Sequence, residues 1–592
     1  MPPASLPSLP WQFTGNHWIA LPCVHPADGA VHAIGLLHRG ARGAVEFAGS
    51  ADFQAGTGPA LARPTLRVDG AEVALAREGI AWERALHWLP TFTATVGELL
   101  VRGTVFAPYG RDADIAGAVY AIAVENRGSS AREVTLSLEG VLGHRQLRIR
   151  TPRPGDDRHV AFHAPNDAVV LEGAEAPGLA ALAIGGESVD AVEVTGGDAP
   201  TFALRRKLVV PPKGRAEVAF YLAAGAERDG ALATLEVLRR RGWRTLLAST
   251  RDALQALEQL TGVDALDGLL NRNLLFAYFY AVGRALDDAH FYIVRSRAPW
   301  HPEGVTVREW EALSWVIPAV QLADPDLARE LILRMCEVHG YVPGRGVNYL
   351  DGSLFAPGFT LEGCAAYAIA VDRYIRETGD DRIVEENVLA DTLYVSSDML
   401  AERRDKTHPL YHTDVTPSGL PAPQPFTLHG NAVVAFALDS LKRTLDEEAA
   451  KAVQDPTAVR AAIRRHFVTD TGAKSTFVAA SDLRSATTLD DDPASSVLWL
   501  PFYEAVERTD SIYRRTVKRI PPGASLAQRL GRLLGPDASS ELEWLRRAPL
   551  ALGVASEFVD ADGAATANAG DATVAGLLAY AVWFTVHAHG VR

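Results

Sequence analysis

The pattern of apolar and polar residues along this chain changes near residue 230. Before about residue 225, short apolar runs alternate with polar residues and are separated by Gly, Pro, Asn and Asp, which is typical of strands. Strands are expected at residues 99–106, 118–126, 133–140, 168–172, 180–184, 202–210 and 216–222. Many short strands at this spacing predict an antiparallel β-sandwich.

After residue 230 the apolar period becomes helical. Helices are expected at residues 231–260, 266–282, 307–322, 324–339, 360–377, 382–403, 431–445, 456–467, 494–506, 511–519, 539–547 and 569–587. Several are apolar enough to be buried on both sides, which favours helical pairs stacked in a ring or solenoid. Long loops rich in Pro, Gly, His and aromatic residues lie between them, at residues 284–305, 340–358, 405–428, 468–493 and 548–568. Such loops in a compact domain are usually functional.

A chain of 592 residues is too long for one ordinary core. We therefore expect a β-sandwich domain at residues 1–228, linker helices at 229–262 and a helical domain at 263–592. The formal charge of −14 leaves no basic surface for nucleic acid or an anionic membrane. The N-terminus lacks the features of a signal peptide, and no run of about 18 apolar residues predicts a membrane span.

The cysteines at positions 23, 336 and 364 are far apart and match no zinc or disulfide spacing. We expect a cytoplasmic protein with no cofactor and no metal, and leave homo-oligomerisation open. The acidic run at residues 490–492 resembles a calcium or magnesium site, but helix capping by Asp492 with Pro493 is the preferred interpretation.

The segment of residues 307–315, with the sequence VREWEALSW, holds the most informative chemistry. It places Glu309 and Glu311 beside Trp310 and Trp315 at the start of an apolar helix. A carboxylate buried without partners is costly, so this helix end is expected to line a polar cavity. The alternative is a solvated first turn, where the helix dipole favours acids.

The order of these parts and four short motifs resemble the glucoamylase-like and trehalase-like inverting glycoside hydrolases. The motifs are REWEALSW at 308–315, FTLEG at 359–363 leading to YIRETGD at 374–380, the segments 413–419 and 430–431, and SEFV at 556–559. The resemblance implies a multidomain α and β fold, an N-terminal antiparallel β-sandwich followed by an (α/α)6 toroid. Relatives often have Asp where this chain has Glu309 or Glu311, and the full trehalase signature is absent, so the resemblance does not identify the sugar.

Glycoside hydrolysis needs a protonated carboxylic acid and a second carboxylate that activates water or attacks directly. Glu309 or Glu311 is the predicted acid, with a slight preference for Glu309, and residues two apart on a helix lie on different faces. Glu557 is the predicted base, in a loop between Gly553 and the turn at 560–563. The alternative for Glu557 is a solvated loop glutamate.

The predicted substrate-binding residues lie in the same helix starts and loops. They are Glu362, Trp310, Trp300, Arg308, Tyr349, His429 and Asn431. Aromatic rings pack on sugar C–H faces, and the resemblance implies a sugar-binding acid at Glu362 and a substrate-facing segment at Asn431. Each loop histidine, His301 included, is taken singly as a surface residue, and Arg295 as either a substrate ligand or a surface ion pair.

The predicted function is a glycosidase that cleaves an oligosaccharide or a small glycoside with inversion. A toroid can also carry a polysaccharide lyase or a sugar epimerase, in which His and Tyr move the proton. A non-catalytic carbohydrate-binding protein is the third alternative, because a fold alone does not guarantee activity.

Overall fold

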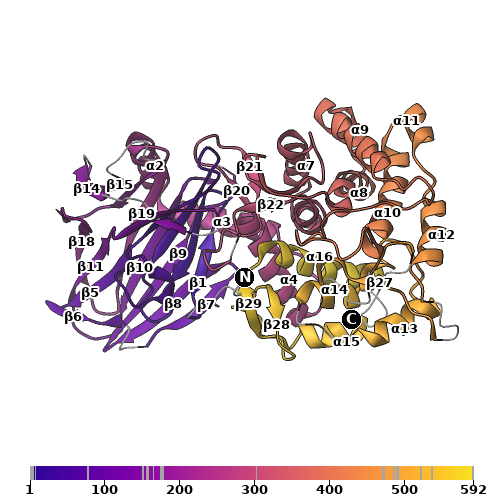
Figure 1. Cartoon of the computed structure of the whole chain (residues 1–592). Helices are drawn as coiled ribbons and strands as arrows, with labels where there is room; N and C mark the ends of the chain where they lie inside the picture. Colours follow the sequence, from indigo (N-terminus) through magenta and orange to yellow (C-terminus); the bar gives the residue numbers. More distant parts are fainter. Residues whose placement is uncertain are drawn as a thin grey trace.

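The computed structural model describes most of the chain, and Figure 1 shows it as a sheet-rich N-terminal part beside a helical C-terminal part. The described residues are 6, 9–75, 79–111, 113–149, 152–154, 159–164, 166–173, 179–301, 303–469, 474–484, 487–488, 493–520, 523, 525–534 and 538–589. The acidic run at 490–492 lies outside them.

The N-terminal strands form antiparallel sheets of six, eight and five strands. The strands are β1 Gln12–Gly15, β2 Ile19–Val24, β3 Ala33–His38, β4 Gly43–Ala48, β5 Arg63–Val68, β6 Ala71–Val73, β7 Ala81–Ala85, β8 Leu89–Val96, β9 Leu99–Phe106, β10 Gly117–Asn126, β11 Arg132–Val141, β12 His144–Arg148, β13 Pro152–Pro154, β14 His159–Ala164, β15 Ala168–Gly173, β16 Ala181–Gly186, β17 Ala191–Thr195, β18 Thr201–Val210 and β19 Arg215–Gly225. The expected strands all fall on members of this set, whereas β1–β8, β12–β14 and β17 were not among the predicted strands.

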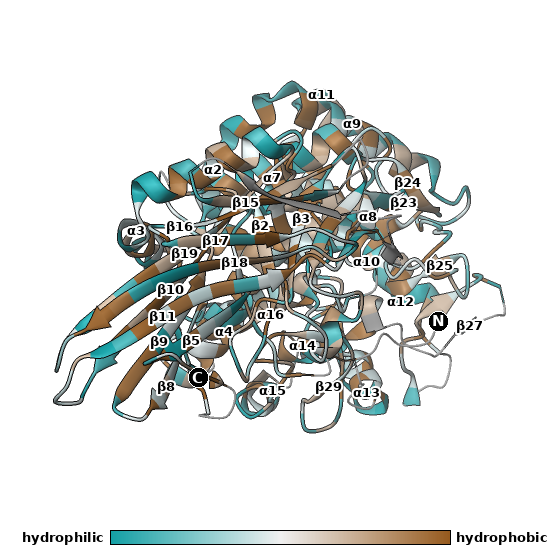
Figure 2. Cartoon of the chain, turned by 90° about the vertical axis from the view of Figure 1, so that its left-hand side faces the viewer, coloured by the Kyte–Doolittle hydropathy of each residue, from teal (hydrophilic) through white to brown (hydrophobic). Residues whose placement is uncertain are grey.

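The sandwich core is one apolar cluster to which all three of these sheets contribute residues. Leu136 and Leu138 of β11 meet Ile122 of β10 and Phe220 and Leu222 of β19 in one apolar cluster. Figure 2, which views the sheets from their outer side, shows hydrophilic and hydrophobic residues alternating along the long strands. That alternation buries one face of each strand, as an antiparallel sandwich requires.

The helical part follows β19 directly. Its helices are α2 Arg228–Arg241, α3 Trp243–Ala256, α4 Asp264–Phe276, α5 Glu309–Glu311, α6 Ile317–Ala323, α7 Pro325–His339, α8 Leu361–Thr378, α9 Asn387–Glu402, α10 Leu428–Thr444, α11 Glu447–Ala452, α12 Pro456–His466, α13 Ser511–Arg519, α14 Leu526–Leu533, α15 Ala538–Leu545 and α16 Ala572–His589. Short hairpins are built from β20 Val282–Arg284 with β21 Phe291–Ile293, β22 Thr306–Arg308 with β23 Gly346–Tyr349 and β24 Leu354–Pro357, β25 Phe426–Thr427 with β26 Ala480–Ser481 and β27 Thr487–Thr488, and β28 Ser556–Val559 with β29 Ala565–Ala569.

The helices close into a ring with inner and outer members. The last helix, α16, packs on α4, which opens the ring, and also on α6 and α14. The inner helices α8 and α10 are almost wholly buried, whereas α7, α9 and α12 each expose one side. This arrangement is the toroid that the resemblance implied.

Three expected helices differ in the structure. The segment 231–260 is two helices, because Gly242 at φ 74° ends α2 before α3 begins. The segment 307–322 begins as strand β22 and continues through α5 into a π-helical turn, Ala312–Val316. Within 494–506 the structure has the 3₁₀ turns Pro493–Ser495 and Val497–Trp499 and no α-helix.

Aromatic packing joins the first sheet to the ring. Phe13 of β1 and the neighbouring Trp88 contact Phe276, Phe279 and Tyr280, which lie at the end of α4 and in the π-helical turn after it. The two parts therefore share one apolar cluster. An interface of this kind holds domains rigidly, since it resembles a core more than a transient contact.

Candidate active site

The helix start at Glu309 points its two acids in opposite directions, as the sequence predicted. Arg308 is still extended, and α5 begins at Glu309. Glu309 turns toward Gly344 and Tyr367 of α8, while Glu311 turns toward Arg295 and Thr573 of α16. The π-helical turn that follows widens the helix, a feature that recurs at functional sites.

Arg295 connects Glu311 with the C-terminal part of the ring. Its Nε donates to Glu311 Oε2 at 2.8 Å, and its Nη2 donates to Asp571 Oδ2 at 3.0 Å. The same Nη2 lies 3.8 Å from Glu557 Oε2. Two segments far apart in sequence, residues 309–311 and 557–571, thus meet at one guanidinium.

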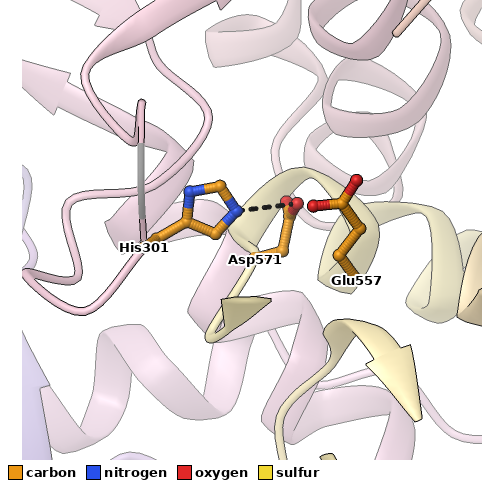
Figure 3. A group of neighbouring side chains, drawn as sticks. All are labelled: His301, Glu557 and Asp571. Atoms are coloured by element: carbon orange, nitrogen blue, oxygen red, sulfur yellow. Dashed lines mark hydrogen bonds and ion pairs between the residues drawn. The ribbon is translucent and has the colours of Figure 1, made fainter. Parts of the chain in front are cut away.

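Asp571 and Glu557 both lie at the open end of the β28–β29 hairpin, and Figure 3 shows them beside His301. Asp571 follows β29 and caps α16 by accepting from the amides of Thr573 and Val574. Its other oxygen lies 3.1 Å from His301 Nε2. Glu557 belongs to strand β28, not to the loop that was expected, and accepts from Asn568 Nδ2 across the hairpin at 2.5 Å.

Burial and charge distinguish these carboxyl groups. The Asp571 side chain is inaccessible to solvent, whereas that of Glu557 is 26% exposed. Burial raises the pKa of Asp571, but the Arg295 guanidinium and His301 outweigh it and hold that pKa well below its ordinary value. Asp571 is therefore ionised at neutral pH and keeps Arg295 in place.

His301, Glu557 and Asp571 lie close enough to share a metal ion by distance alone. The guanidinium of Arg295 contacts both carboxylates, so a cation there would meet an existing positive charge. The chemistry of the group therefore fits an ion-paired cluster better than a metal centre.

Glu309 has a different environment: no arginine among the described residues bonds it, and Arg345 acts on it only through its charge. Its oxygens accept from Gly344 N at 2.8 Å and from the Tyr367 hydroxyl at 2.7 Å. Burial raises its pKa to about 8 against the opposing effect of these hydrogen bonds. With Arg308 and Trp310 it lines a small pocket whose opposite wall is formed by β23, β24 and residues 415–419.

Glu362 and His429 form a second buried pair beside Trp310. Glu362 Oε1 lies 2.9 Å from His429 Nδ1, and its Oε2 accepts from Thr360. The ring of His429 packs edge-on to those of Trp310 and Tyr503. His429 is thus a buried residue of α10, which corrects its assignment to a surface loop.

The remaining predicted binding residues have the following contacts. Arg308 bonds Glu311 at 3.0 Å and Glu303 at 3.3 Å. Trp300 is buried against Gly570, and Tyr349 packs on Phe355. The amide of Asn431 bonds the main chain of Tyr411 and Thr427 and so holds a loop. The contact with substrate stays a prediction for each of these residues.

Sequence reasoning missed three contributors to the cluster. His301 was taken as a surface residue but is fully buried, and Asp571, which is also fully buried, was not among the predicted site residues. Thr573, one turn into α16, bonds both Glu311 and Asp571. The sequence did contain one signal for this site. Asp571 is an acid that stands directly before α16, a helix apolar enough to be fully buried.

Comparison with known proteins supports the fold. No protein-family model and no curated protein sequence matches this chain. A bacterial glucoamylase solved with acarbose superposes with a TM-score of 0.64 at 11% identity, covering 100% of this chain and 96% of that one. A putative kojibiose phosphorylase from the human microbiome gives a TM-score of 0.59 at 12% identity, covering 97% and 86%. The chain therefore has the β-sandwich-plus-toroid fold of these proteins, and the predicted fold class is confirmed.

Proposed function

We propose that this protein is a glycoside hydrolase that cleaves an oligosaccharide or a small glycoside with inversion, using Glu311 and Glu557. The observation that carries the proposal is their shared contact with Arg295, at 2.8 and 3.8 Å. A two-carboxylate mechanism needs its acid and its base on the two sides of one bond. These two acids come from α5 and β28 and contact the neighbouring Nε and Nη2 of one guanidinium.

Glu311 acts as the proton donor. The cluster holds Glu303, Glu311, Glu557 and Asp571 against the cations Arg295 and Arg308, so acids outnumber fixed positive charges. Asp571 is held ionised by Arg295 and His301. Glu311 is the other buried acid of the cluster, and we assign it to donate the proton to the leaving oxygen.

Glu557 acts as the base. It is the most exposed carboxylate of the four, so a water molecule can reach it. Asn568 holds its Oε2 and leaves Oε1 available to accept the proton of the attacking water. An inverting enzyme holds its two carboxyl groups about 6.5–9.5 Å apart, with room for a water molecule, and we assign this arrangement to Glu311 and Glu557.

Glu309 is the second candidate for the proton donor, because a carboxyl with a pKa of about 8 is protonated at neutral pH. Its contacts run to Gly344 and Tyr367, on the far side of α5 from Glu557. We therefore propose that Glu309 has a structural role and supports the wall of the small pocket. The variants described below separate it from Glu311.

Hydrolysis is favoured over phosphorolysis by the charge of the cluster. A phosphorylase must bring a phosphate dianion to the position that a hydrolase gives to water. Here the carboxylates of Glu557 and Asp571 lie beside the Arg295 guanidinium and would repel a dianion. A water molecule is uncharged, so these carboxylates do not repel it.

The test compares single Gln variants on two kinds of substrate: hexose disaccharides and 4-nitrophenyl glycosides. Glu311→Gln should lower kcat on disaccharides by about 10²–10⁴-fold, and less on nitrophenyl glycosides, whose leaving group needs no proton. Glu557→Gln should lower kcat on both, and azide should restore turnover. Glu309→Gln and the exposed control Glu543→Gln should retain activity.

Two further results test the proposal: the stereochemistry of the product and the pattern of activity among the variants. NMR of the first product should show inversion at the anomeric carbon. Full activity of both Glu311→Gln and Glu557→Gln would refute the assignment. Loss in Glu309→Gln with normal Glu311→Gln activity would transfer the donor role to Glu309.

A further inference from the structure

The loop at residues 294–301, termed here the Arg295 loop, contacts the candidate active site on one side and the N-terminal sheets on the other. Arg295 and His301 reach Asp571, while Arg297 reaches into the N-terminal part of the chain. We propose that the N-terminal sheet domain positions the catalytic cluster by holding the Arg295 loop through Arg297 and Arg148. This inference rests on the proposed function and gives the β-sandwich a role in it.

Arg297 ties three segments together. Its Nη1 donates to the carbonyls of Asn16 and Phe279 at 2.7 and 3.0 Å, and its Nη2 donates to that of Trp18 at 2.9 Å. Asn16 and Trp18 lie between β1 and β2, whereas Phe279 belongs to the ring. A shift of the first sheet would therefore move Arg297.

Arg148, at the end of β12, holds the same loop from a second strand. Its Nη2 donates to the carbonyl of Arg297 at 3.1 Å, and its Nε bonds Glu46 of β4 at 2.7 Å. Gln146 donates to the other Glu46 oxygen at 2.5 Å. The side chains of Arg148 and Glu46 are almost inaccessible to solvent, so the sheet presents a rigid, pre-aligned donor to the loop.

The free-energy cost of burying the Arg297 guanidinium indicates that this contact does more than join two domains. The hydrogen bonds recorded for the Arg297 guanidinium are all to carbonyls, and burial lowers its pKa to about 10. A buried cation without a carboxylate partner is expensive, and apolar residues would join the domains at lower cost. What an arginine adds here is fixed geometry, because its planar fork binds several carbonyls at once.

The Arg295 loop contacts the catalytic cluster directly, so a shift of the loop changes where the cluster residues lie. Ser296, between Arg295 and Arg297, donates its hydroxyl to the carbonyl of Gly570 at 2.6 Å. Gly570 precedes Asp571, which pairs with Arg295 and His301. A displacement of Arg297 would thus move both partners of the Arg295–Asp571 pair, and displacements near 1 Å cost catalysis about 10²-fold.

The experiment uses the full-length protein and four variants: Arg297→Met, Arg297→Lys, Arg148→Met and the control Arg205→Met. Arg205 also lies in the N-terminal sheets and forms ion pairs, with Glu193 and Glu139, but has no recorded contact with the Arg295 loop. Each variant is measured for kcat and KM on whichever disaccharide the wild type hydrolyses. Hydrogen exchange is followed at the amides of Arg295, Ser296 and Arg297, which bond Thr306, Gly304 and Tyr280.

Arg297→Met and Arg148→Met should lower kcat, for Arg297→Met on the order of 10²-fold, with less effect on KM. Their three loop amides should exchange faster, while those of α8 and α10 stay protected. Arg297→Lys, which keeps the charge and part of the donor set, should recover part of both losses. Arg205→Met should match the wild type.

A purely structural role predicts a different result. In that case kcat would fall only with the folded fraction, and α8 and α10 would exchange faster together with the loop. Wild-type kcat and loop exchange in Arg297→Met would likewise overturn the proposal. If the wild type hydrolyses no glycoside, the proposed function fails, whereas the exchange data still decide whether the sheets hold the loop.

Discussion

Replacing Arg295 by Met should be the most damaging single change to the candidate active site. The substitution keeps an unbranched side chain but removes the only cation among the described residues that bonds both Glu311 and Asp571. Both carboxylates are buried, with exposed side-chain fractions of 3% and 0%. Neither can turn to solvent when its partner is lost.

The magnitude follows from this burial. Removing one partner of a buried ion pair costs about 3–5 kcal/mol, because the other charge stays desolvated. Arg308 still pairs with Glu311, and His301 still bonds Asp571, so we expect one such loss rather than two. A typical domain is stable by only about 5–15 kcal/mol, so the variant should unfold at a much lower urea concentration.

The pH dependence gives the sharper test. In the wild type the pKa of Asp571 is held below its ordinary value, so its stabilising effect is full above pH ~3.9 and is lost as pH falls further. The difference between wild type and Arg295→Met should therefore be full at pH 7 and shrink below pH ~4.

The assay is urea unfolding followed by tryptophan fluorescence at several pH values, with Arg205→Met as the exposed control. Arg205 ion pairs are solvent-accessible, so the control should move the midpoint little at any pH. Equal midpoints for Arg295→Met and wild type at pH 7 would refute the reasoning. So would a difference that stays constant from pH 7 to the acid range.

Three further predictions test neighbouring features. The pKa of Glu309 is about 8, so the wild type should lose stability relative to Glu309→Gln as pH rises from ~4 toward 8. Urea unfolding midpoints of the two proteins that differ by the same amount at every pH would contradict this. Tyr367→Phe removes a hydrogen bond to Glu309 and should cost about 1 kcal/mol in urea unfolding; an unchanged midpoint would argue against that bond. Gly570→Ala places a Cβ 2.5 Å from Trp300 Nε1 at a backbone φ of 67°, so it should lower the melting temperature and shift the tryptophan emission. Wild-type values of both would show that the Trp300 side chain moves aside at little energetic cost.

Much of the fold could be predicted because period and burial agree along many elements. The expected strand 99–106 is β9 and the expected helix 511–519 is α13, residue for residue. The predictions failed where tertiary contacts override local pattern. Residues 307–308 look helical from the apolar run that follows them, yet they pair with β23, and the helix begins only at Glu309.

The candidate site was only partly visible in the sequence. The acids at 309, 311 and 557 were selected because carboxylates beside tryptophans and turns are unusual before buried helices. Arg295 and His301 carried no such signal, because arginines and histidines in a long polar loop are usually exposed. Both are buried through contacts with Glu311 and Asp571, residues that lie elsewhere along the chain.

By itself, then, the sequence determined the two architectures and their order, because alternating and helical hydrophobic periods depend on residues close together along the chain. It also marked the helix start at Glu309 and Glu311 as chemically unusual. Only the tertiary structure decided which acids share a cation. Arg295 and Asp571 are 276 residues apart, and their 3.0 Å contact exists because the last helix closes the ring against the first. Pairings over such distances depend on how buried surfaces fit together, and no local pattern records that fit.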